Sequence, residues 1–179
     1  INKTTAITLP YDIPAGYTPV VVTRTGGPDA PGNLLRRVDV TGPRTLTVEG
    51  PDAHGRKLFI GIPYESSYTF STFAIREGDS KGNAVTTGRL QLRRLTLNCS
   101  NTGFLHMHVT PKFRPTSTYT FTHGTNIIGA IPLYTGTINF PILSLNTQVE
   151  VKVGSDSFLP FALVNASWEG FYNTRNARV

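Results

Sequence analysis

The chain has 179 residues, of which 39% are hydrophobic and 16% are charged, and it contains a single cysteine, Cys99. This length is enough to bury a hydrophobic core without metals or disulfides. One cysteine excludes an intramolecular disulfide and the cysteine spacings of zinc sites, and it fits assembly in a reducing cytoplasm. With 17 Lys and Arg against 11 Asp and Glu, the net charge of +6 favours an anionic partner such as nucleic acid, a membrane surface or an acidic polymer.

Short apolar and polar alternations, separated by frequent glycine and proline, dominate the first half of the chain. This pattern predicts short strands joined by turns rather than helices. The predicted strands of this half are residues 1–9, 20–22, 34–38, 45–48, 58–62 and 68–73. No apolar run approaches the roughly 20 residues of a membrane-spanning helix, so we expect no membrane span.

The central tract, residues 86–109, is the longest stretch with strand chemistry, and we interpret it as a β-hairpin. Residues 98–103 are rich in Asn, Ser and Gly and would form the turn. Residues 104–109 then place aromatic and histidine side chains on one face and aliphatic side chains on the other, until Pro111 ends the strand.

The arginines of this hairpin are the candidate functional residues. Leu90 and Leu92 alternate with polar residues, but the next leucines are Leu95 and Leu97, so the alternation shifts by one residue at Arg93-Arg94. Such a shift predicts a β-bulge that exposes both cations. The hairpin is either structural or presents arginines to a polyanion. The candidates for contact with DNA or with another subunit are Arg89, Arg93 and Arg94.

The second half continues the strand pattern. Its predicted strands are residues 117–123, 136–140, 148–153 and 161–168. We expect the second of these four to end at Pro141, and Trp168 to be buried on one face with Ala162, Val164 and Ala166. The sequence thus predicts an all-β fold of about ten to twelve strands in antiparallel sandwich-like or barrel-like sheets, with long turn-rich loops. A polar linker suggests two small lobes, residues 1–80 and 81–179.

Few residues suggest catalysis or metal binding. His106 and His108 share a strand face and could bind a metal if His123 or a carboxylate joined them, although a histidine-lined sheet face is the preferred interpretation. Glu169 beside Trp168 could belong to an aromatic carbohydrate site, but a Glu paired with an Arg is preferred. No catalytic or phosphate-binding motif occurs, so we expect no enzyme activity, no metal and no cofactor.

Several motifs, in their order and spacing, resemble the C-terminal part of tail tubular protein B, the tail nozzle family of short-tailed podovirus bacteriophages. The main motifs are residues 85–97, 100–104, 157–160 and 166–175, and residues 58–64, 68–71 and 131–136 agree with them. The resemblance implies a largely β virion protein that forms a homohexameric tube below an adaptor ring, through which the genome leaves the capsid.

The resemblance also implies partners and a location. The expected partners are other subunits of the same protein, the tail adaptor protein, tail fibres and, transiently and independently of sequence, duplex DNA. The expected location is the virion tail, after assembly in the bacterial host cytoplasm. Family chains are several times longer, so a chain that begins at Ile1 without Met is expected to be a C-terminal fragment. The alternative functions are binding, or hydrolysis, of a host-surface polysaccharide.

Overall fold

The structure is a computed structural model that describes residues 4–35, 38–49, 55–76, 84–85, 88–123 and 133–174. In these ranges it contains 13 strands and one short 3-10 helix, η1 (Asn146–Gln148). The strands form several small antiparallel sheets, none of which closes into a barrel, so the predicted all-β class is confirmed. No helix of the described ranges is long and apolar enough to cross a membrane.

The described residues group into two compact units, one up to Tyr64 and one from Glu65 onward. The first unit contains two three-stranded sheets, each with a short buried apolar face. Their strands, in spatial order, are β1 (Thr4–Thr8), β5 (Thr45–Glu49) and β4 (Val38–Gly42), then β3 (Leu34–Leu35), β2 (Val20–Thr23) and β6 (Leu58–Gly61). The predicted lobes, residues 1–80 and 81–179, remain a prediction of domain organisation.

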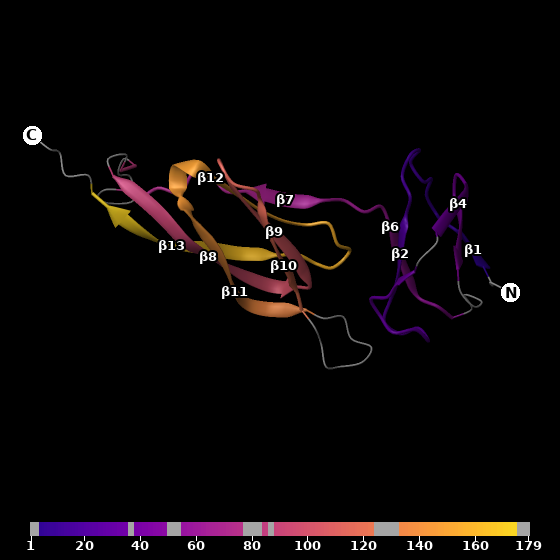
Figure 1. Ribbon diagram of the computed structural model, residues 1–179. Helices are drawn as coiled ribbons and strands as arrows, with labels where there is room; N and C mark the ends of the chain where they lie inside the picture. Colours follow the sequence, from indigo (N-terminus) through magenta and orange to yellow (C-terminus); the bar gives the residue numbers. More distant parts are fainter. Residues whose placement is uncertain are drawn as a thin grey trace, which may run out of the picture. The chain divides into compact units, whose positions relative to one another are not determined.

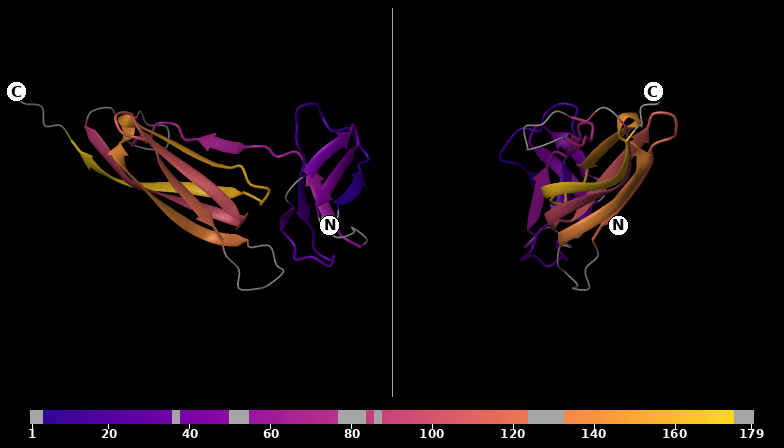
Figure 2. Two further views of the ribbon diagram at one scale, coloured as in Figure 1. Left: turned by 45° about the vertical axis from the view of Figure 1, so that its right-hand side comes forward. Right: turned by 90° about the vertical axis from the view of Figure 1, so that its left-hand side faces the viewer.

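The second unit is a two-layered sandwich, visible in Figures 1 and 2. One layer has the order β10 (Ser117–Thr122), β9 (Phe104–Pro111), β12 (Val149–Ser155) and β7 (Ser66–Thr69). The other has the order β11 (Tyr134–Leu145), β8 (Arg89–Thr102) and β13 (Leu163–Asn173). A single hydrophobic cluster joins the inner faces of both layers, because Leu95 and Leu97 of β8 share it with Met107 of β9 and Val153 of β12.

The predicted hairpin of residues 86–109 is wrong in its pairing. The strands β8 and β9 form as expected, but they belong to different layers and face each other across the core. At the turn, the Gly103 N–H donates to the Pro160 carbonyl at 2.9 Å, and the Thr102 hydroxyl accepts a hydrogen bond from the Ala162 N–H at 3.1 Å. Because both strands have a largely apolar inner face, a crossover between layers buries more surface than side-by-side pairing would.

Two further expectations about strands are corrected by the structure. The strand β11 continues through Pro141, because β11 is paired on one side only in the described sheet and an edge strand tolerates a proline. Val164 is 65% exposed rather than buried, since the pairing of β13 with β8 shifts register between Leu163 and Asn165, and Ala162 and Ala166 are exposed as well. Trp168 is only partly buried and packs edge-on against Phe73, with ring centroids 6.0 Å apart.

The unequal burial of β8 and β13 predicts unequal effects of truncation. Leu95 is 0% exposed, so Leu95→Ala should lower the free energy of unfolding by about 2–5 kcal/mol. Val164→Ala, on the exposed side of the edge strand, serves as control and should change it by less than about 0.5 kcal/mol. Urea denaturation of both variants measures this difference. Equal losses would show that β8 is not the centre of the core.

Candidate functional site

The bulge predicted at Arg93-Arg94 is present, and it extends across the whole sheet. Arg94 pairs with Glu169 of β13, but the next pair is Leu92 with Gly170, so Arg93 is an extra residue in β8. On the other side of β8, the extra residue is in β11, because two residues of β11 stand opposite Arg93. The three strands therefore follow arcs of different length, and the sheet bends here. The bend leaves Leu92 buried while Arg93 and Arg94 are both exposed.

Arg94 is the arginine of the bulge that already has an anionic partner. Its Nη2 donates a hydrogen bond of 2.6 Å to Oε1 of Glu169. This hydrogen bond lowers the pKa of Glu169 and raises the pKa of Arg94, and the charge of Arg93 lowers the pKa of Glu169 further. The expectation that Glu169 pairs with an arginine rather than lining a carbohydrate site is confirmed.

Arg93 and Arg89 differ from Arg94 in their surroundings. Neither forms an ion pair with any residue in the part of the chain that the structure describes. Arg89 lies four positions before Arg93 on β8, about 13 Å away along the strand. The structure therefore brings Arg93 and Arg94 together and places Arg89 elsewhere, at the start of β8.

Beyond the bulge, the outer face of this sheet is a network of neutral polar side chains. Asn98, in the middle of β8, accepts a hydrogen bond from the Thr137 hydroxyl at 2.6 Å and donates one to Asn165 at 2.5 Å. Thr96 donates to Asn139 at 2.7 Å. The network was not predicted, although the signal was present: Thr and Asn alternate with leucine along β8. These three hydrogen bonds link the polar side chains of β8 to the strands on both of its sides.

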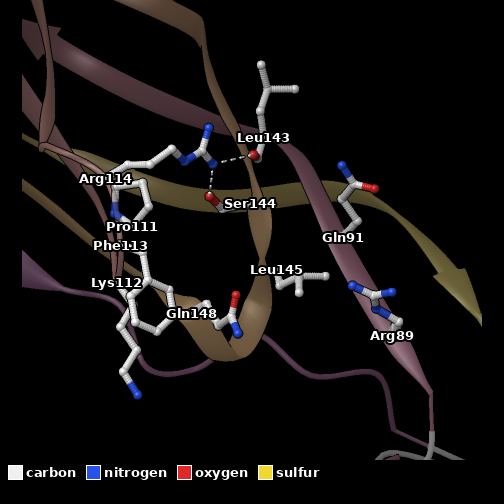
Figure 3. Close-up of a pocket in the computed structure, with 10 residues that line it drawn as sticks. All are labelled: Arg89, Gln91, Pro111, Lys112, Phe113, Arg114, Leu143, Ser144, Leu145 and Gln148. Carbon is white, nitrogen blue, oxygen red and sulfur yellow. Dashed lines mark hydrogen bonds between the residues drawn. The ribbon is translucent and has the colours of Figure 1, made fainter.

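Arg89 belongs to a second basic surface, which sequence reasoning missed. It lines a cavity of about 270 Å³ together with Lys112 and Arg114, which follow β9 (Figure 3). Arg114 Nη2 donates to the Leu143 carbonyl at 3.2 Å and to the Ser144 hydroxyl at 3.0 Å. We call this the basic pocket. The residues that line it are Arg89, Gln91, Pro111, Lys112, Phe113, Arg114, Leu143, Ser144, Leu145 and Gln148. Its cations come from separate stretches of sequence, so no local sequence pattern predicted the pocket.

Within the described ranges, His106, His108 and His123 do not assemble a metal site. His106 and His108 lie side by side on β9 with ring centroids 4.8 Å apart, and His108 Nδ1 is 3.0 Å from the Thr118 hydroxyl. His123 instead packs against Tyr134, with ring centroids 5.3 Å apart. Within the described ranges, no group of three His, Cys, Asp or Glu residues could hold a metal ion.

Cys99 is a buried free thiol on β8, and burial raises its pKa. A buried thiol with a raised pKa is a poor nucleophile and a poor metal ligand. Cys99 therefore belongs to the core and adds no chemistry to the candidate site.

A bent, polar, partly basic sheet face on an all-β sandwich suits a structural virion protein, and comparison with known proteins defines which kind. A family model described as bacteriophage nozzle protein matches residues 1–179, so the chain belongs to the bacteriophage nozzle protein family of structural tail components. The chain is also 31% identical, over 134 residues and 70% of its length, to "Tail tubular protein gp12" of Escherichia phage T7. It spans about 16% of that relative's length. The predicted family resemblance is thus confirmed.

The Arg94–Glu169 pair predicts a shifted titration. The pKa of Glu169 should lie below its ordinary value of 4.5, and Arg94→Gln should raise it toward that value. Because the folded-state pKa is lowered, the pair stabilises the fold above the unfolded pKa, and this contribution is lost as the pH falls through the folded pKa. Carboxyl-detected NMR titration of both proteins measures the change.

Glu65 is the internal control for this titration, because Lys152 lowers its pKa through a separate hydrogen bond of 2.9 Å. The pKa of Glu65 should be the same in the Arg94→Gln variant. A Glu169 pKa that does not respond to the variant would contradict the pairing.

Proposed function

We propose that this chain forms part of the wall of the tail conduit through which the phage genome passes into the host. The observation that carries the proposal is the position of Arg93: it is an exposed cation that forms no ion pair within the described ranges, and it lies at the bulge of β8 beside the neutral polar side chains of Thr96 and Asn98. The net charge of +6 gives the chain a general attraction for polyanions.

This face has the properties that a DNA conduit needs. Cations that contact phosphate attract the duplex without reading its sequence, whereas unsatisfied groups facing base edges would make it pause at preferred sites. Neighbouring amides and hydroxyls form hydrogen bonds with one another, as those of Asn98 illustrate. The groups used in these bonds do not form hydrogen bonds with DNA. Sparse cations on a satisfied polar surface therefore allow weak contact and passage.

The remaining parts of the proposal concern assembly. The chain acts as a structural component rather than as an enzyme, in a homohexamer whose other partners are the tail adaptor protein and tail fibres. It assembles in the bacterial host cytoplasm, where the single cysteine stays reduced, and functions in the virion tail. Arg89 and Arg94 share the proposed role of Arg93 in contacting DNA or a neighbouring subunit. No observation favours polysaccharide binding or hydrolysis over this role.

The proposed DNA contact predicts a change in salt dependence. Binding of a fluorescent duplex to the assembled tail protein should be weak and should weaken with salt. Arg93→Ala should lower the magnitude of the slope of log K against log [salt] by roughly one unit, with no change in sequence preference. Fluorescence anisotropy over a series of salt concentrations measures the slope.

Arg44→Ala is the matched control, because Arg44 is an exposed arginine that already pairs with Asp12 in the other unit. It removes the same formal charge and should leave the slope unchanged. If Arg93→Ala and wild type have identical slopes, Arg93 does not contact DNA. If both variants lower the slope equally, the effect is one of net charge and the face has no special role.

A further inference from the structure

The basic pocket carries a charge that no carboxylate of the described residues neutralises. Among the described residues, its lining includes three cations, Arg89, Lys112 and Arg114, and no carboxylate. Neither Arg89 nor Lys112 forms an ion pair with a residue of the described ranges. Like charges held around one cavity repel one another, so an anionic group placed among them would be stabilised. The pocket is therefore suited to bind an oxyanion.

The same pocket also has an apolar rim. Phe113 is 78% exposed and Leu143 is 59% exposed, and both line the same pocket, so they form a small exposed apolar patch. Arg114 is held by its bonds to the Leu143 carbonyl and Ser144, and Leu143 has a φ of 52°, which is a rare backbone conformation for leucine. A rare conformation that is fixed by hydrogen bonds and exposes an apolar side chain indicates a surface prepared for contact. Arginine and aromatic residues are also enriched among the residues that dominate binding at protein interfaces.

These features favour a peptide over nucleic acid as the occupant. A duplex presents phosphates from a convex backbone, and its apolar groups lie in the grooves and between base steps, away from those phosphates. A peptide segment with an acidic side chain next to an aromatic one would satisfy both the cations and the apolar rim. The occupant should therefore be a loop that carries these two side chains close together.

The chain itself contains such a loop between β12 and β13. The Asp156 side chain is 69% exposed and its one ion-pair contact in the described ranges is a distant one, 3.8 Å from His106 Nδ1. Phe158, two residues further on, is 46% exposed. Two hydrogen bonds between residues close in sequence hold the loop. The Ser157 N–H donates to the Ser155 hydroxyl at 3.3 Å, and the Leu159 N–H donates to the Ser157 hydroxyl at 3.2 Å. We call residues 156–158 the acidic loop.

The basic pocket and the acidic loop lie at opposite ends of the same unit. Arg89 begins β8, whereas the segment after the acidic loop bonds to Gly103, just beyond the other end of β8. The 14 residues of β8 separate these ends by roughly 40 Å, so one copy cannot join its own loop to its own pocket. Figure 1 shows the β12–β13 connection and the start of β8 at opposite ends of the sandwich.

We propose that the acidic loop of one copy of this chain docks into the basic pocket of the next. Asp156 is placed among Arg89, Lys112 and Arg114, and Phe158 packs against Phe113. The two surfaces differ, so the contact is heterologous, and repeated contacts of this kind close a ring or extend a filament. The proposal rests on the chain's role in a multisubunit tail and identifies the surfaces that join its subunits.

Photo-crosslinking in the assembled tail identifies the occupant directly. Phe113→p-benzoylphenylalanine keeps an aromatic ring at an exposed position, so the fold should tolerate it. After irradiation of virions that carry this change, mass spectrometry should find crosslinks to residues 154–160 of another copy. Crosslinks to DNA, to a different protein or to another segment of the chain would overturn the proposal, as would the absence of any crosslink.

Charge variants on both surfaces test the same contact in the full-length protein. Lys112→Glu should weaken self-association by about tenfold or more, since it places two negative charges together, and Asp156→Lys alone should weaken it as well, since it places a lysine among three cations. Sedimentation velocity measures the association. Lys57→Glu, an exposed reversal in the other unit, is the control and should have no effect. If either Lys112→Glu or Asp156→Lys leaves self-association unchanged, the proposed docking is wrong. Neither result depends on whether Arg93 contacts DNA.

Discussion

The strand β8 is the element on which the rest of the second unit depends, and its leucines determine its path. Leu92, Leu95 and Leu97 are all 0% exposed, yet they do not share one alternation, so an extra residue must be accommodated between them. Each buried leucine contributes about 1.5–3 kcal/mol, whereas a bulge forfeits roughly one hydrogen bond, worth about 0.5–1.5 kcal/mol. Burial therefore wins, and the extra residue, Arg93, is exposed at a bend.

That bend connects packing to function. The same register shift that buries the leucines exposes two adjacent arginines, and Glu169 then neutralises Arg94 while Arg93 has no carboxylate partner in the described ranges. Further along β8, polar side chains satisfy one another across three strands. A structural tail protein of this family thus gains an exposed arginine at the bend, beside a polar side-chain network.

Local patterns predicted what depends on local spacing. The alternation of leucines was enough to predict the bulge at Arg93. An arginine partner for Glu169 was also predicted, but not which arginine, because Arg94 is 75 residues away in the sequence. Contacts between distant segments were not predictable in this way. Asn and Gly at the turn suit a hairpin and a crossover equally well, so the pairing of β8 with β11 and β13 could not be derived. The basic pocket was missed for the same reason, because Arg89 and Arg114 meet only through the packing of two layers.

The central claim is that the bent outer face of β8 lines the tail conduit. Cryo-electron microscopy of the intact virion tail, at a resolution that shows arginine side chains, tests it most directly. The account predicts that Arg93 faces the lumen and that the polar network around Asn98 forms the surrounding wall. A map in which this sheet face points outward, or is covered by another subunit away from the lumen, would contradict it.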